Sequence, residues 1–116
     1  MNTINLDKTQ FKERVRFWAD KTDTPVISIT IRPMKTKWAS YSTTGRLTFD
    51  ELLMELNQDL RDYVIVHELL HFHVPNHGKL WKSLMRVHLG NYESKEAQLK
   101  EIARDKKLQQ AFSISC

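Results

Sequence analysis

The segment 58–72 constrains the fold most, because it is apolar on every side of the helix that it predicts. Its centre reads Tyr-Val-Ile-Val at 63–66 and continues with Leu69 and Leu70. A helix that has no polar face must be surrounded by other elements of the chain. Asn57 is a suitable N-cap for it, and Pro75 ends it because the residue before a proline disfavours α geometry. We therefore expect one buried central helix.

The remaining segments predict a small sheet and further helices. Residues 7–20 carry apolar side chains at helical spacing, with Asp7 as the candidate cap. The expected strands are 26–31, which is rich in β-branched residues, and 37–41 and 46–49, which flank a Ser-Thr-Thr-Gly turn. The other expected helices are 78–88, which Gly90 ends, and a last helix from Asn91 or Ser94 to about Gln110. The fold class is α+β: a three-stranded sheet packed on a buried helix, with flanking helices.

Size and composition limit the kind of protein. A chain of 116 residues and 13.7 kDa has room for a single domain, 1–116, whose motifs lie in 32–88. Its only cysteine is Cys116, so a disulfide framework and a cysteine-based zinc cluster are excluded. No signal-peptide-like run opens the chain and no apolar run is long enough for a membrane span, so we expect a cytoplasmic protein.

Charge is distributed unevenly along the chain. Residues 1–40 hold eight Lys and Arg against four Asp and Glu, 41–75 hold two against six, and 76–116 hold eight against four. An acidic middle, with a balance of −4, therefore lies between two ends with a balance of +4 each. These ends are either solvated helical surface or a basic rim that attracts nucleic acid or an acidic partner; Lys79, Lys82 and Arg86 are the candidate contacts.

The buried helix contains the pattern His67-Glu68-Leu69-Leu70-His71. At the helical rotation, His67 and His71 lie about 40° apart and one turn from each other, so their imidazoles can share a metal ion. Glu68 is close enough to reach a water molecule on that metal without ligating it. This is the arrangement of a zinc peptidase, with two ligands, a general base and an open coordination position. Two hydrogen-bonded core histidines beside a surface glutamate are the alternative.

A third ligand must come from the three other histidines. His73 lies about 200° round the helix from His71 and points away. His88 lies about 16 Å from His77 along the next helix, too far to share the same ion. His77 follows Pro75 and Asn76, where the chain has left the helix, and is the best geometric candidate.

Four motifs follow one another between Arg32 and Trp81. They are Lys-Trp-Ala-Ser at 37–40, Gly-x-Leu-x-Phe at 45–49, Asp-Tyr-Val-Ile-Val-His-Glu-Leu-Leu-His at 62–71 and Asn-His-Gly-x-x-Trp at 76–81. In these the chain resembles the YgjP-like zinc metallopeptidase family, which is related to the SprT-like and WLM zinc peptidases. The resemblance implies a compact zincin-like fold, Zn²⁺, and His77 as third ligand in an HExxH-x5-H pattern. Ala39 and Tyr41 depart from the residues usual in the family, which bears on substrate fit.

A mechanism follows from this interpretation. Zinc held by His67, His71 and His77 lowers the pKa of its bound water toward about 7. Glu68 accepts the proton as the water attacks a peptide carbonyl, and passes it to the leaving amine. Tyr92 and Tyr41 are candidate donors to the developing oxyanion, although tyrosines in such positions are more often packing aromatics.

The sequence also suggests where a substrate binds. The segment 46–49 is expected to be an edge strand beside the metal helix, where an extended substrate pairs by strand addition. Trp38 and Trp81 are expected to be core or wall residues.

Three functions are compatible with these features. The leading hypothesis is a zinc-dependent endopeptidase that acts on peptide or unfolded protein. The alternatives are a non-catalytic zinc-stabilised module that binds protein or nucleic acid, and a DNA-associated protease of SprT-like type. Structural zinc sites are normally closed sets of four ligands rich in cysteine, so three histidines favour an open site. Three imidazoles also accept manganese, nickel or iron.

Overall fold

The computed structural model describes the chain from residue 3 to residue 107, with side chains from Asp7 to Arg104. Cys116 and the expected end of the last helix at Gln110 lie outside the described residues. The elements are α1 (Thr3–Lys21), β1 (Ser28–Arg32), β2 (Ala39–Tyr41), β3 (Arg46–Asp50), the 3-10 helix η1 (Glu51–Glu55), α2 (Gln58–His73), α3 (Lys79–Leu89) and α4 (Glu93–Lys107). The expected α+β fold is confirmed, with a helix in every segment where one was predicted.

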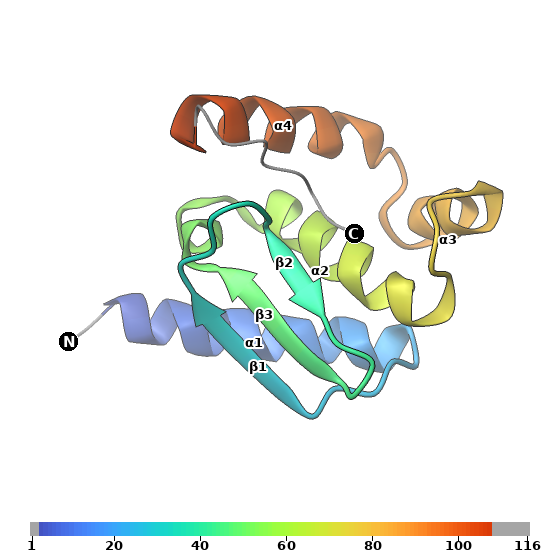
Figure 1. Ribbon diagram of the computed structural model, residues 1–116, viewed down its shortest axis with the longest axis horizontal. Coiled ribbons are helices and arrows are strands. Elements are labelled where there is room, and N and C mark those ends of the chain that lie inside the picture. Colours follow the sequence, from blue (N-terminus) through green and yellow to red (C-terminus); the bar gives the residue numbers. More distant parts are fainter. Residues whose placement is uncertain (1–2, 108–116) are drawn as a thin grey trace.

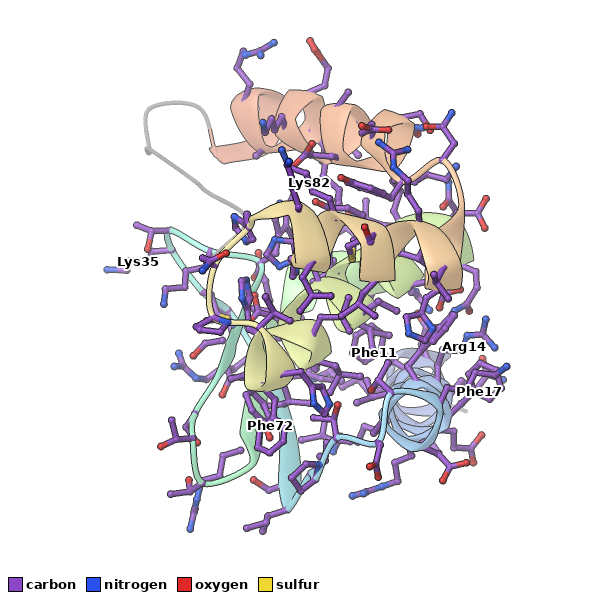
Figure 2. All side chains as sticks on the ribbon, turned by 90° about the vertical axis from the view of Figure 1, so that its right-hand side faces the viewer. Phe11, Arg14, Phe17, Lys35, Phe72 and Lys82 are labelled. Atoms are coloured by element: carbon purple, nitrogen blue, oxygen red, sulfur yellow. The ribbon has the colours of Figure 1, made fainter. Side chains whose placement is uncertain are left out.

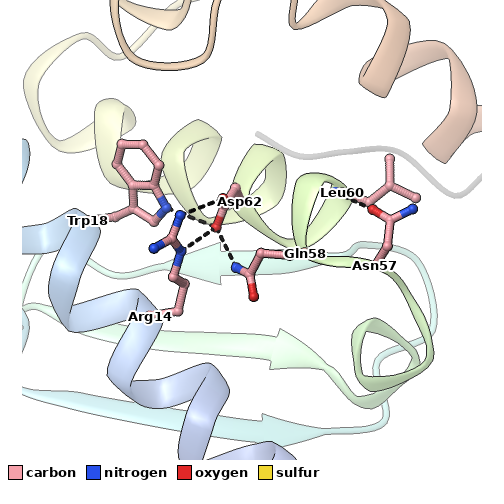
Figure 3. Close-up of polar contacts among 6 residues, drawn as sticks. All are labelled: Arg14, Trp18, Asn57, Gln58, Leu60 and Asp62. Atoms are coloured by element: carbon pink, nitrogen blue, oxygen red, sulfur yellow. Dashed lines mark hydrogen bonds and ion pairs between the residues drawn. The ribbon is translucent and has the colours of Figure 1, made fainter.

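Helix α2 is the centre of the molecule. Every residue from Asp62 to Leu70 on it is buried. The helix contacts α1, β2, α3 and α4, and Figure 1 shows α1 running behind the sheet, α2 passing beside β2, and α4 lying across the top. Asn57 caps α2 as predicted, because its side-chain oxygen accepts a hydrogen bond of 3.0 Å from the Leu60 amide (Figure 3).

The order of strands in the sheet is β1-β3-β2. β1 runs parallel to β3 and β2 runs antiparallel to it, so β3 is the central strand. The prediction that 46–49 form an edge strand is therefore wrong, and β2 is the edge beside α2. The physical reason is length: β1 pairs with β3 over five residues, whereas β2 offers a partner of only three.

The helix boundaries follow local chemistry. Helix α1 begins at Thr3, four residues before the expected cap, so Asp7 lies inside the helix. Its carboxylate instead pairs with Arg61 of α2 at 3.0 Å. Gly90 ends α3 as predicted, because it adopts φ +68°, a left-handed conformation that glycine tolerates without strain.

A buried carboxylate on α2 joins this helix to α1 (Figure 3). Asp62, with 7% of its surface exposed, accepts two hydrogen bonds of 2.9 Å from the Arg14 guanidinium and one of 2.9 Å from the Trp18 indole. Gln58 donates a further bond of 2.7 Å. The sequence analysis did not identify this network, because Arg14 and Trp18 lie more than forty residues before Asp62 along the chain.

Removing the carboxylate leaves the Arg14 and Trp18 donors without their acceptor. We expect Asp62→Ala to lower the free energy of unfolding by about 2–4 kcal/mol, as measured by urea denaturation. Glu101→Ala, which breaks the exposed pair with Arg104 at 2.7 Å, is the matched control and is expected to cause no measurable change. An equal effect of the two substitutions would contradict the structural role of Asp62.

Candidate active site

Three histidines converge where α2 ends. His67 and His71 lie one turn apart on α2, and the chain turns back after Val74 to bring His77 beside them. The ring centroids are 5.0 Å apart for His67 and His71, 4.9 Å for His67 and His77, and 4.7 Å for His71 and His77. One ligand-capable atom from each lies within 4.8 Å of the others. The structure thus brings together the three predicted ligands.

The connection after α2 has a local reason for its shape. The Asn76 side chain accepts a hydrogen bond of 2.9 Å from the Gly78 amide, just before α3 begins. A Cβ at position 78 would lie 2.8 Å from this Asn76 oxygen and displace it. Glycine at position 78 therefore leaves room for the Asn76 oxygen that its amide bonds in the turn carrying His77.

Hydrogen bonds orient the imidazoles for a metal ion. His71 Nδ1 lies 3.3 Å from the Val74 carbonyl, and because a carbonyl only accepts, this contact assigns the proton to Nδ1 and the lone pair to Nε2. That Nε2 faces His77 Nε2 at 2.9 Å. His67 is buried, and its Nδ1 has no hydrogen-bond partner within the described part of the chain. The donor set therefore fits a divalent ion.

Electrostatics keep two of these rings in the ligand form. Burial lowers the pKa of His71, and the neighbouring His67 lowers it further. Burial and the two other imidazoles likewise lower the pKa of His77. Both rings are thus neutral near pH 7, and a neutral imidazole is the form that binds a metal.

Trp81 packs against all three imidazoles. Its ring centroid lies 5.0 Å from that of His67, 6.2 Å from that of His71 and 4.5 Å from that of His77. Trp81 and Trp38 are both buried. Their placement is that of packing residues, as expected from the sequence.

A cavity of about 280 Å³ opens beside the histidines. It is lined by Lys37, Ala39, Ser40, Tyr41, Glu68, His71 and Pro75. Glu68 has 5% of its surface exposed, and its Oε2 lies 3.5 Å from His67 Nδ1. The cavity therefore contains a carboxylate next to the histidine triad. Lys37 and Ser40 were not identified as site residues, although the Lys-Trp-Ala-Ser motif contains both.

The two tyrosines predicted as oxyanion donors lie in different places. The Tyr41 ring lines the cavity and contacts Phe72, while its hydroxyl donates a hydrogen bond of 2.8 Å to the Pro25 carbonyl. Tyr92 is buried, with its ring against Tyr63 and Trp81, and is not among the residues that line the cavity. Burial raises the pKa of both hydroxyls, so both stay protonated at neutral pH.

The two remaining histidines lie away from the triad. His73 Nε2 is 3.2 Å from the Thr24 hydroxyl. The His88 ring packs edge-on against Trp18, with centroids 6.1 Å apart. Both positions agree with the prediction that these side chains do not share an ion with His67 and His71.

A family model of the YgjP-like metallopeptidase domain matches residues 5–102. The chain belongs to this family. It is also 37% identical over 82 residues to the uncharacterized protein MJ0123 of Methanocaldococcus jannaschii, which covers 67% of this chain and 74% of that protein. Family membership identifies the chain as a metallopeptidase and implies a divalent metal, for which the histidine triad is the fitting donor set.

Solved structures of two metallopeptidase zymogens share the fold. The jannalysin zymogen of Methanocaldococcus jannaschii is 32% identical with a TM-score of 0.68, over 81% of this chain and 95% of that one. The abylysin zymogen of Pyrococcus abyssi is 22% identical with a TM-score of 0.69, over 89% and 99%, and shows likeness of fold alone. No helix in the described part of this YgjP-like domain is long and apolar enough to span a membrane.

The lowered histidine pKa values predict how the stability of the metal-free protein depends on pH. The pKa values of His71, His77 and His88 lie below the ordinary 6.5, so the unfolded chain takes up protons at a higher pH than the folded one. The free energy of unfolding should therefore fall between about pH 7 and about pH 5.5. Urea midpoints measured in EDTA test this.

His88→Gln provides a control that leaves the triad intact. Burial is the main cause of the lowered pKa of His88, followed by the charge of Lys21. The urea midpoint of His88→Gln should therefore fall less than that of wild type as the pH is lowered. A midpoint that rises as the pH falls would contradict the assignment of depressed pKa values.

Proposed function

We propose that this metallopeptidase domain is a zinc-dependent endopeptidase that hydrolyses extended peptide or unfolded protein, with Glu68 as its general base. The observation that carries the proposal is the buried Glu68 carboxylate in a cavity that it shares with His71 of the triad. His67, His71 and His77 are the proposed ligands. Bound Zn²⁺ would supply a Lewis acid that acidifies water and polarises a peptide carbonyl.

The proton transfers are assigned to Glu68. Its carboxylate accepts a proton from the attacking water and later donates that proton to the amine that leaves when the C–N bond breaks. Helix α2 fixes the position of this carboxylate, since the residues on both sides of it are buried. Of the two candidate oxyanion donors, Tyr41 is favoured because it lines the cavity. Its hydroxyl would give up the hydrogen bond to the Pro25 carbonyl and donate to the substrate oxyanion instead.

The edge of β2 that faces away from β3 is the proposed binding place for the substrate backbone. Trp38 accepts a hydrogen bond from the Asp50 amide, and Ser42 donates one to the Arg46 carbonyl. In an antiparallel ladder every second residue bonds to its partner strand, so the backbone groups of Ala39 and Tyr41 point away from β3. Both residues line the cavity with Glu68. An extended peptide can add to this edge by main-chain hydrogen bonds.

The non-catalytic zinc module is the less favoured function. A structural zinc site is usually closed by four protein ligands. Within the described part of the chain, the group of residues able to hold one ion consists of three histidines, one of them exposed. This composition leaves a coordination position for water or substrate and favours catalysis.

Metal retention tests the ligand assignment. We expect about one zinc ion per purified chain, and we expect His77→Ala to lose most of it, because two imidazoles hold the ion less tightly than three. His73→Ala and His88→Ala are matched controls that remove an imidazole outside the triad and should retain the ion. Metal analysis after gel filtration measures the outcome. Loss of zinc from His73→Ala together with retention in His77→Ala would refute the ligand set.

Glu68→Gln separates an enzyme from a zinc module. Glutamine preserves the size of the side chain but cannot accept the proton, so the variant should keep its fold and zinc while proteolysis falls by roughly 10²–10⁴-fold. Cleavage is measured by mass spectrometry on an unfolded protein and a broad peptide library, with zinc content determined on the same samples.

Both solved relatives are zymogens, so the assay for Glu68→Gln includes latent activity. Each sample is tested before and after limited proteolysis with a protease that is then inhibited. Equal cleavage by zinc-loaded wild type and Glu68→Gln, or none by either form in both conditions, is the result that rejects the endopeptidase.

A further inference from the structure

The two chain segments around the cavity contain no carboxylates. Residues 24–49 include β1, β2 and most of β3, and residues 69–92 include the end of α2 and all of α3; neither range contains Asp or Glu. At the chain's own frequency of 14 acidic residues in 116, these 50 residues would hold about six. They contain seven cations: Arg32, Lys35, Lys37, Arg46, Lys79, Lys82 and Arg86.

Of these seven cations, only Arg86 pairs with a carboxylate in the described part of the chain. Arg86 is neutralised by Glu93 at 2.7 Å. In contrast, the exposed Lys35, Lys37, Lys79 and Lys82 form no ion pair with any carboxylate in the described part of the chain. We call them the lysine rim. Figure 2 shows the connection from β1 to β2 with Lys35 at the left and α3 with Lys82 above it, whereas Arg14 and Phe17 of α1 lie at the right.

Lys37 belongs to the cavity itself, together with Glu68 and His71. Lys37 lies two residues before Ala39, the first residue of β2, and it lines the cavity together with Ala39, Ser40 and Tyr41. A substrate strand that pairs with β2 and continues past Ala39 presents every second side chain to one face. One substrate side chain would then lie beside Lys37. It would be about 7 Å along the substrate strand from the substrate side chain opposite Ala39.

We propose that this cavity selects acidic peptide segments, with Lys37 pairing with an Asp or Glu side chain of a substrate bound along β2. The inference rests on the proposed peptidase function and adds the substrate class. A cation in the cavity wall, with further unpaired cations on neighbouring segments, raises the local concentration of anionic ligands and repels basic ones. The outward backbone groups of Ala39 and Tyr41 form a ladder with another peptide backbone, which favours a peptide over nucleic acid as the ligand.

Cleavage of a position-scanning peptide library tests the selection. Zinc-loaded wild type should prefer Asp or Glu over Lys or Arg at one position relative to the cleaved bond, by about fivefold in kcat/KM, and the preference should shrink as salt is raised. Lys37→Glu should reverse the preference at that position. Lys12→Glu makes the same charge change on α1, outside the cavity lining, and should leave the preference as in wild type.

A binding measurement separates this inference from the catalytic proposal. Fluorescence anisotropy of Glu68→Gln with a labelled acidic peptide, and with its basic counterpart of equal length, reports selection without turnover. Binding that favours the acidic peptide and is lost in the Lys37→Glu, Glu68→Gln double variant supports the inference even if wild type cleaves nothing. Cleavage of acidic and basic peptides at equal rates overturns the inference and leaves the peptidase intact. Stronger, Lys37-dependent binding of a single-stranded oligonucleotide of the same charge also overturns it.

Discussion

The structure depends on the burial of α2. A helix that exposes almost none of its middle must have every polar group on it satisfied from within the protein. Three such groups, Asp62, His67 and Glu68, lie within seven residues of one another on its buried part. Asp62 is satisfied by donors from α1 and from its own helix. Within the described residues, His67 and Glu68 have no comparable set of hydrogen-bond partners; they lie 3.5 Å apart, and Glu68 lines the cavity. The helix therefore has a structural part around Asp62, which holds the fold together, and a chemical part at His67 and Glu68, which carries the groups proposed for catalysis.

The Asp62 network and the histidine site are connected through α2. Asp62 lies five residues before His67, so the contacts that hold α1 against α2 also fix the helix that carries two of the proposed ligands. On the other side of the site, Trp81 of α3 packs against the same imidazoles. The histidine site is therefore held between two helices by packing and needs no disulfide in a domain of this size.

The parts of the fold that were predictable from the sequence are those set by local chemistry. The central helix, its Asn57 cap, the glycine stop at Gly90 and the hairpin turn follow from neighbouring residues. The predicted edge position of 46–49 was wrong, because the side on which β1 joins the hairpin depends on contacts between distant residues. The start of α1 was wrong for a similar reason: Asp7 resembles a cap, yet its partner is Arg61.

The candidate site, like the fold, was predictable only where residues close together in the sequence determine it. Helical spacing alone brings His67, Glu68 and His71 to one region, so those residues were identifiable from the sequence. His77 required knowledge of how the chain turns after Pro75, and the Asn76–Gly78 hydrogen bond is the local feature that makes this turn. Lys37 belongs to the Lys-Trp-Ala-Ser motif, but the sequence does not show that this segment meets Glu68 and His71 of α2 at one cavity.

The exposure of the three histidines rises from buried His67 through His71 to exposed His77. A metal bound by all three would therefore link the buried helix α2 to a surface connection. Such an ion binds the folded chain in preference to the unfolded one, and the resulting stabilisation grows with metal concentration. This stabilisation would act mainly on residues 75–78, whose contacts include the Asn76–Gly78 hydrogen bond and the packing of His77 on Trp81. In this domain metal binding would thus complete the site by fixing its most exposed ligand.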